Sequence, residues 1–250
     1  LEQDPRPPGF LRGKAKASLE AERCGKGIEL DDMGVAPRQP ALDTERTMPN
    51  IRILTALMGF TLAAVASAQE QKPLLTGASL PRLAAPSFKE PLDASFSVAK
   101  GKWTPQDGVL SVLDIPEEKH IPVLHHKVGL KDAVIEVEFL LEGPGSFLVG
   151  CDSDKHVGRV VVNAAGLSIA EDSVKPSHTI ARAPLPVKPG EWHQLRVEWR
   201  GDQMAARLDG KELRAQHAYL ATSKSRSWLA AGKSVKVRNL RISGEKTAKP

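Results

Sequence analysis

The stretch EWHQLRVEWRGDQMAARLDGKEL, residues 191–213, decides the fold of this chain. Apolar and polar residues alternate from His193 to Arg200, which is typical of a β-strand with one buried face. Gly201-Asp202 suits a two-residue turn, because glycine adopts a positive φ without steric cost. The pattern therefore predicts a β-hairpin with one strand on either side of this turn.

The turn also predicts which residues of the two strands face each other. Apolar side chains meet on the core rungs, which pair Trp199 with Met204, Val197 with Ala206 and Leu195 with Leu208. A slip by one residue would turn all of them to the wrong face of the sheet. One rung sets Arg196 against Arg207, which carry like charges. We expect their diagonal neighbours, Glu198 and Asp209, to offset the repulsion.

Similar alternating segments, separated by turn residues, recur along the rest of the chain. They predict about eleven short strands and no convincing helix. Pro122 indicates an edge position or a bulge in one strand, and a shift of the apolar pattern near Asn239 indicates a bulge in the last. Outside the hairpin, the expected strands are 96–98, 109–113, 120–126, 133–141, 146–151, 158–162, 167–170, 227–230 and 234–243, and residues 172–190 are expected to form a long loop with one short apolar stretch at 179–181. Such a chain is predicted to be all-β, a two-sheet antiparallel jelly-roll sandwich.

Residues 48–68 have the features of a secretory signal peptide. Arg52 precedes an apolar run over residues 53–65, and Ala66-Ser67-Ala68 follows as a small-x-small cleavage site. The run is shorter than the roughly 20 residues that a membrane-spanning helix needs. We expect a signal-peptide helix that is cleaved after Ala68, no stable membrane span after cleavage, and a secreted or periplasmic protein.

The remaining segments differ in composition. Residues 1–47 mix proline, glycine and both charges without a sustained period, and we interpret them as a disordered leader or as sequence upstream of the true start at Met48. Residues 69–94 are rich in proline, alanine and leucine, which indicates a linker or an extended strap. We expect the sandwich over residues 95–243 and a disordered tail over 244–250.

Charge and cysteine content narrow the classes of function. The chain has 35 Lys and Arg against 30 Asp and Glu, but the basic residues are scattered and lack interleaved aromatic residues. This distribution predicts no nucleic-acid partner. Of the two cysteines, Cys24 lies in the leader, which leaves Cys151 alone in the sandwich. Its apolar neighbours, residues 147–150, predict a buried side chain rather than a nucleophile.

Four segments, taken in order, resemble the concanavalin A-like lectin/glucanase superfamily and, within it, the 3-keto-disaccharide hydrolase domain family. They are DGVL after Trp103, then DAVIEVEFLLEG, PGEWHQLRVEWRGDQMAARLDGKEL and VKVRNLRISG. The resemblance covers residues 95–243. It implies a two-sheet jelly roll whose concave face is used for carbohydrate, and an activity on 3-keto-glycosides. The hairpin pattern is also shared with laminin-G-like modules.

Glu136 and Glu138 project to one face of their predicted strand, about 7 Å apart at Cα. Glycoside hydrolysis uses two carboxylates, and Glu138 is the candidate catalytic residue here. The family 16 glycoside hydrolases of this superfamily carry Glu-x-Asp-x-(x)-Glu, whose third carboxylate is replaced by Leu140 or Leu141. Glu136 is a candidate carbohydrate ligand. The alternative for both glutamates is a solvated or cross-strand-paired outer face.

Arg159 and His156 complete the candidate catalytic set. An arginine beside three valines needs an acidic partner or a polar concave site, where its planar fork suits sugar hydroxyls or carboxylates. Asp152 and Asp154 alternate with His156 in a polar loop, so that Ca²⁺ is a possible cofactor held by the two aspartates. The alternative is a polar turn between strands.

Trp103 and His120 are the remaining candidate carbohydrate contacts. A tryptophan ring can stack on a sugar, but a position in the hydrophobic core is an equally good interpretation of Trp103. For His120, the alternative is a structural role without a ligand. Two functions follow from these patterns. One is an exported domain that binds a glycan or hydrolyses a keto-sugar glycoside. The other is a non-catalytic adhesion or protein-interaction module of the laminin-G-like type. The sequence leaves open whether the protein is an enzyme.

Overall fold

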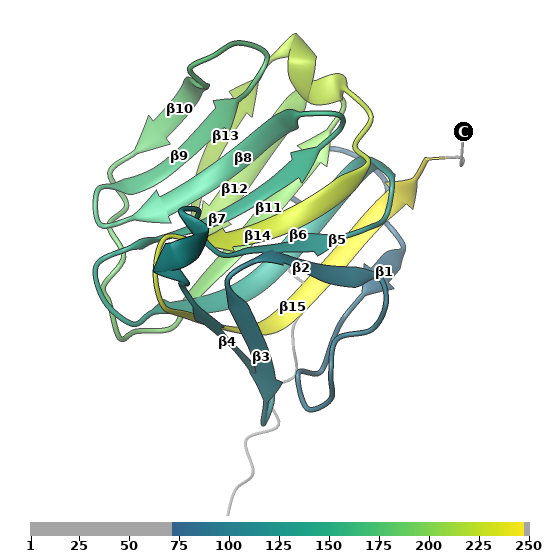
Figure 1. Cartoon of the computed structure of the whole chain (residues 1–250). Coiled ribbons are helices and arrows are strands. Elements are labelled where there is room, and N and C mark those ends of the chain that lie inside the picture. Colours follow the sequence, from purple (N-terminus) through teal and green to yellow (C-terminus); the bar gives the residue numbers. More distant parts are fainter. Residues whose placement is uncertain (1–71, 248–250) are drawn as a thin grey trace, which may run out of the picture. The chain divides into compact units, whose positions relative to one another are not determined.

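The computed structural model describes residues 72–247, which form two antiparallel β-sheets packed face to face (Figure 1). Sheet A has eight strands in the order β13-β12-β11-β6-β15-β4-β3, with β1 beside β15. Sheet B has seven strands in the order β10-β9-β8-β7-β14-β5-β2. The predicted all-β two-sheet sandwich is confirmed. The predicted leader, signal peptide and cleavage site lie outside the described residues.

Sheet A contains β1 (Arg82–Ala84), β3 (Lys102–Gln106), β4 (Val109–Leu113), β6 (Leu130–Leu141), β11 (His193–Arg200), β12 (Gln203–Leu208), β13 (Lys211–Gln216) and β15 (Val235–Lys246). Sheet B contains β2 (Phe96–Lys100), β5 (Val123–His126), β7 (Ser146–Asp152), β8 (His156–Asn163), β9 (Gly166–Glu171), β10 (His178–Ala183) and β14 (Arg226–Ala231). Two short 3-10 turns, η1 (Pro116–Glu118) and η2 (Ala218–Ala221), complete the described elements. Within residues 72–247, no helix has the length and apolar character to cross a membrane.

The hairpin of β11 and β12 has the predicted register. The three apolar rungs join Trp199 to Met204, Val197 to Ala206 and Leu195 to Leu208. Gly201 in the turn has a φ of 53°, a conformation that glycine adopts without strain. All six side chains on these rungs are buried in the core between the sheets. The alternation of the sequence thus determines which face of sheet A enters the core.

The rung of Arg196 and Arg207 is stabilised by residues of the neighbouring strands. Arg196 donates to Glu198 and, across to β6, to Glu136, both at 2.6 Å. Arg207 instead pairs with Glu212 of β13 at 2.6 Å. The prediction for Glu198 is confirmed, but the prediction for Asp209 is wrong, because that carboxylate pairs with His193.

The structure contains several strands that the sequence pattern did not predict. β3 and β13 lie at the two edges of sheet A, where a strand buries few side chains and lacks a clear alternation. The prediction of a loop over residues 172–190 is wrong in part, because His178–Ala183 form β10 at an edge of sheet B. Pro122 was expected to mark an edge position or a bulge in a strand over 120–126. Only Val123–His126 are in a strand, which β2 pairs with, so that it is not an edge strand, and the register of this pairing shifts next to Val123. The predicted bulge is confirmed by Asn239, which has a φ of 52° beside a break in the register of β15.

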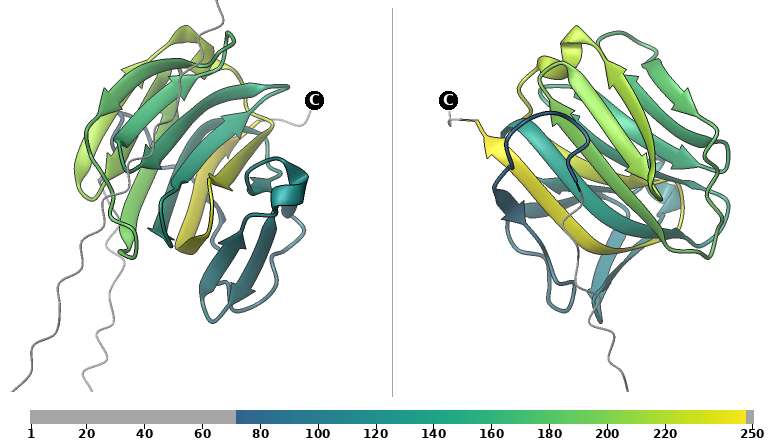
Figure 2. Two further views of the ribbon diagram at one scale, coloured as in Figure 1. Left: turned by 60° about the vertical axis from the view of Figure 1, so that its left-hand side comes forward. Right: turned by 180° about the vertical axis from the view of Figure 1, so that it is seen from behind.

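The segment before the first predicted strand is an extended strap over the outer face of sheet A (Figure 2). Leu74 and Leu75 donate their backbone N–H groups to the Glu198 carboxylate and pack on Ala205. The strap ends in β1, which pairs with β15. Toward the C-terminus, β15 continues to Lys246, past the predicted end of the last strand at residue 243.

Cys151 lies on the core face of β7 and is fully buried, as predicted. Burial raises the pKa of its thiol to about 12. A thiol with such a pKa stays protonated at neutral pH and is a poor nucleophile. The side chain therefore belongs to the hydrophobic core.

His126 predicts a pH dependence of the stability. Its ring is buried against Phe96, with ring centroids 5.1 Å apart, and neither ring nitrogen has a hydrogen-bond partner among residues 72–247. Burial lowers the pKa of His126, while the charge of Asp93 acts to raise it and that of Lys246 to lower it. The unfolded chain therefore binds a proton more readily, and stability falls as the pH drops from the ordinary histidine pKa through the lowered one.

We expect His126→Leu to reduce the loss of unfolding free energy between about pH 7 and about pH 5, since the leucine cannot bind a proton. Urea unfolding at several pH values measures this slope. His120→Leu, at an exposed ring, is the matched control and should keep the slope of the wild-type protein. Equal slopes in the wild-type and His126→Leu proteins would contradict the assignment.

Candidate functional site

The structure divides the predicted site residues between the outer faces of the two sheets. Glu136 and Glu138 lie on β6 and face outward from sheet A. Four of the other polar candidates line one pocket of about 520 Å³ on the outer face of sheet B, namely His120, Asp152, His156 and Arg159, whereas Asp154 is exposed outside it. The two glutamates therefore cannot act on a ligand bound at the histidines and the arginine.

The pocket lies over the middle strands of sheet B, between β2 and the segment that precedes β10. Its floor is apolar, and its rim carries cationic and hydrogen-bonding groups. The pocket residues that the sequence analysis did not select include Lys100, His125, Leu148, Ser177, Arg226, Trp228 and Ala230.

Trp228 lies flat on the sheet because its neighbour on β7 is Gly150. The two residues are paired across β14 and β7, and a Cβ atom at Gly150 would overlap the indole ring. The ring is 6% exposed, and its Nε1 donates to Asp152 Oδ1 at 2.5 Å. A glycine opposite a tryptophan thus gives the pocket a flat floor.

Asp152 is the hub of the polar rim. It is only 2% exposed, and it accepts hydrogen bonds from His156 Nδ1 at 2.7 Å and from Arg226 Nε at 2.9 Å, besides the indole bond. Burial acts to raise the pKa of Asp152, but the hydrogen bonds from His156 and Arg226 outweigh it and hold the pKa below its ordinary value. The carboxylate is therefore ionised at neutral pH and positions its cationic partners.

His156 is exposed to the pocket and to solvent, with 57% of its side chain accessible. Its hydrogen bond to Asp152 raises the pKa of the imidazole, and burial opposes this effect less strongly. The ring also lies beside Trp228, with centroids 5.4 Å apart. This arrangement holds one ring nitrogen fixed and leaves the other free to bind or to exchange a proton.

Arg159 meets both of the alternatives that the sequence left open, because it has an acidic partner and lines the pocket. Its Nη1 contacts both oxygens of Asp172, at 2.6 and 2.5 Å, and its Nη2 donates to Ser177 Oγ at 2.7 Å. The Ser177 hydroxyl donates in turn to Asp172. Such a triad fixes the plane of the guanidinium, and Arg159 still lines the pocket.

The two carboxylates at the pocket, Asp152 and Asp172, are both paired with cationic side chains. Among residues 72–247, Asp152 is the one carboxylate that lines it, and Asp172 lies behind Arg159. A glycosidase that uses two carboxylates needs both of them at the scissile bond. The pocket supplies hydrogen-bond donors and an apolar floor instead, which suits the binding of a polyhydroxylated ligand.

Glu136 and Glu138 occupy the cross-strand-paired outer face that we gave as their alternative. Glu138 accepts from Arg238 Nε at 2.7 Å and from Asn239 Nδ2 at 2.9 Å. Trp103 packs in the core with 7% of its surface exposed and donates its indole N–H to the Lys100 carbonyl oxygen. Unlike Trp228, it does not line the pocket on sheet B.

The aspartates of the polar loop do not fit a Ca²⁺ site. Asp152 is buried and its oxygens accept from three N–H donors, while Asp154 is exposed to solvent. Ca²⁺ takes six to eight oxygen ligands, at about 2.4 Å. No cluster of three or more acidic, histidine or cysteine side chains with metal-binding geometry occurs in the part of the chain that the structure describes.

His125 and Trp228 are the pocket residues that sequence reasoning should have found. The alternation in their segments places them on the face opposite to the buried Leu124 and Leu229. Their pairing across β5 and β14 brings the two side chains together. Burial lowers the pKa of His125, and the charge of Arg226 lowers it further, so that the neutral imidazole is favoured.

Comparison with known structures supports the fold assignment. The carbohydrate-binding module CBM66 from Bacillus subtilis has a TM-score of 0.51 and 11% identity, over 60% of this chain and 96% of that one. A Bacillus subtilis protein of unknown function with a galectin-like fold has a TM-score of 0.53 and 8% identity, over 67% of this chain and 98% of that one. SCLam, a non-specific endo-β-1,3(4)-glucanase from family GH16, has a TM-score of 0.51 and 10% identity, over 68% and 93%.

No family model matches the sequence, and no curated protein matches it either. The structural similarity therefore establishes the fold, which is that of the concanavalin A-like lectins and glucanases.

We expect Asp152→Asn to lower the pKa of His156 toward its ordinary value, because the hydrogen bond to the carboxylate raises it. The raised pKa adds stability below the ordinary histidine pKa, and this contribution is lost as the pH rises through the raised value. NMR titration of the imidazole C–H signals measures the shift. Asp154→Asn removes an exposed carboxylate two residues away and should leave the pKa of His156 unchanged. An unshifted His156 in Asp152→Asn would contradict the assignment.

We expect Gly150→Ala to displace the Trp228 ring and to lower the free energy of unfolding by about 2 kcal/mol, as other overpacking substitutions do. Tryptophan fluorescence and urea unfolding measure the two effects. Gly143→Ala is the matched control, because a Cβ atom there meets nothing within 4 Å. A Gly150→Ala protein with wild-type stability and fluorescence would show that the ring does not need the glycine.

Proposed function

We propose that the outer face of sheet B binds a glycan without hydrolysing it. The observation that carries this proposal is the pocket itself, in which Arg159 and His156 are held by buried or partly buried carboxylates beside the Trp228 floor. A sugar presents hydroxyl groups around its edge and C–H groups on its faces. The pocket offers complementary donors at its rim and an apolar surface below.

The fixed geometry of the rim supports binding at a low entropic cost. Asp172 and Ser177 hold the Arg159 guanidinium, and Asp152 holds both His156 and Arg226. Side chains that are already ordered lose little rotamer freedom when a ligand arrives. The structural neighbours that are a carbohydrate-binding module and an endoglucanase are consistent with this use of the fold.

A second candidate function is hydrolysis of 3-keto-glycosides, which the sequence resemblance implies. The observation that favours it is the exposed His156 imidazole, whose pKa is raised by its hydrogen bond to Asp152. Such a histidine can serve as a general acid or base near neutral pH. In this case His156 would replace Glu138, which lies on the other sheet. The export of the protein, predicted from residues 48–68, would bring either activity into contact with extracellular or periplasmic glycans.

Glycan-array screening of the full chain, followed by titration of the best oligosaccharide, tests the binding function. We expect Arg159→Gln to weaken binding roughly tenfold, because a charged hydrogen-bond donor is lost. Arg182→Gln on β10 removes the same charge from an exposed position outside the pocket and should bind as the wild-type protein does. Equal affinities of the two variants, or no glycan bound at all, would overturn the proposal.

Incubation of the full chain with 3-keto-glycosides separates the two candidates. Non-catalytic binding predicts that the glycoside is recovered intact. Turnover that is abolished by His156→Gln and retained by Arg182→Gln would instead establish the hydrolase.

A further inference from the structure

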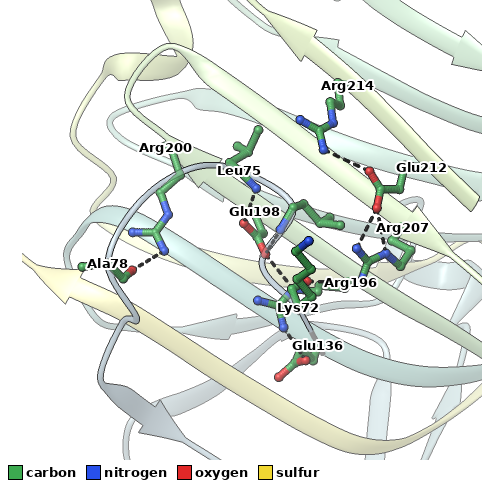
Figure 3. A network of polar contacts seen from close by, with 11 residues as sticks. Lys72, Leu75, Ala78, Glu136, Arg196, Glu198, Arg200, Arg207, Glu212 and Arg214 are labelled. Atoms are coloured by element: carbon green, nitrogen blue, oxygen red, sulfur yellow. Dashed lines mark hydrogen bonds and ion pairs between the residues drawn. The ribbon is translucent and has the colours of Figure 1, made fainter. Parts of the chain in front are cut away.

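The outer face of sheet A holds a second and larger pocket, of about 760 Å³, between the sheet and the strap of residues 72–82. The strap is fixed at four places. Glu198 accepts from the backbone of Leu74 and Leu75, and Arg200 Nη2 donates to the Ala78 carbonyl oxygen at 2.8 Å (Figure 3). Arg207 Nη1 donates to the Lys72 carbonyl oxygen at 3.2 Å, and β1 pairs with β15. The pocket thus has a roof that is tied to its floor by hydrogen bonds.

The charges that line this pocket are unbalanced. Five cationic side chains line it, namely Lys72, Arg82, Arg196, Arg200 and Arg241. Among residues 72–247, Glu136 is the one carboxylate that lines it. Glu198 lies next to the pocket, but it is fully buried, and its oxygens accept from Arg196 and from the strap. An excess of positive charge therefore faces the space under the strap.

The cross-strand register explains how the excess arises. Glu136 on β6 has Arg196 of β11 on one side and Arg241 of β15 on the other. Its carboxylate pairs with Arg196 at 2.6 Å, and Arg241 has no ion pair among residues 72–247. Two arginines thus flank a single carboxylate on β6, which leaves one positive charge uncompensated.

Arg200 supplies a further unsatisfied donor. Its Nε is buried and has no hydrogen-bond partner among the described residues, although Nη2 is bonded to the strap. The nearest carboxylate, Asp132, is 3.9 Å from Nη1. A buried N–H group without a partner is costly. The positive charge of Arg200, which lines the pocket, is thus only weakly compensated.

We propose that this pocket is a binding site for an oxyanion, that is, for a sulfate, phosphate or carboxylate group of a small ligand. Arginine side chains recognise such groups through their planar array of N–H donors. The cations face one another across a partly enclosed space, where a bound anion would relieve their mutual repulsion. This site is separate from the glycan pocket, because it lies on the outer face of the other sheet.

Titration of the full chain with sodium sulfate, sodium phosphate and sodium acetate, each at constant ionic strength in sodium chloride, tests the proposal. Calorimetry gives the affinity, and an anion that binds the folded protein raises the melting temperature. Preference for sulfate or phosphate would identify a sulfate or phosphate ester as the ligand class, and preference for acetate would identify a carboxylate. Binding of none of the three anions would overturn the proposal.

Variants locate the bound anion. We expect Arg241→Gln to weaken anion binding roughly tenfold or more, since one charged donor is lost. Arg82→Gln, at an exposed position of the same pocket, should also weaken anion binding. It serves as the test variant if the Arg241→Gln protein does not fold. Arg214→Gln is the matched control, because Arg214 lies on sheet A outside the pocket. Equal weakening by Arg241→Gln and Arg214→Gln would reveal a response to net charge and would overturn the site.

Arg159→Gln distinguishes this site from the glycan pocket. Anion binding in the sheet A pocket should be unaffected by Arg159→Gln, and glycan binding should be unaffected by Arg241→Gln. Loss of anion binding in Arg159→Gln would place the anion on sheet B and overturn the inference, whatever the fate of the glycan proposal.

Discussion

Every strand of the sandwich sends alternate side chains into one shared core, and this constraint fixes the register of both sheets. The effect is clearest in β6, which pairs with β11 on one side and with β15 on the other. Ile135, Val137 and Phe139 are buried, so that Glu136 and Glu138 must face outward. A slip by one residue would expose the apolar set and bury two carboxylates, at a cost that no local rearrangement could offset.

The same constraint leaves each sheet one outer face for polar chemistry, and each face is organised around a buried carboxylate. On sheet B, Asp152 binds His156 and Arg226 and the indole of Trp228. On sheet A, Glu198 binds Arg196 and two N–H groups of the strap. Removing a carboxylate from water is costly, and several charge-assisted hydrogen bonds offset that cost. The result is two pre-ordered polar surfaces on a rigid scaffold.

Much of the fold could be predicted because the signals for it are local. The hairpin register and the outward position of the two glutamates follow from alternation and turn residues, and the bulge at Asn239 follows from a shift in the apolar pattern. The edge strands β3 and β13 were missed because an edge strand buries few side chains. Lys224 gave no signal either, although its buried ammonium group donates to three backbone carbonyl oxygens.

By itself, the sequence determined the class of the fold, the register of its clearest hairpin and which face of each main strand is buried. These features depend on the alternation of apolar and polar residues, which is a property of residues that are adjacent in the sequence. The tertiary structure alone decided which candidates share a surface. It put His156 and Arg159 over Trp228 and moved Glu138 to the opposite sheet. The physical reason is that strand neighbours are not neighbours in sequence: Asp152 and Arg226 are 74 residues apart, and only the pairing of β7 with β14 joins them.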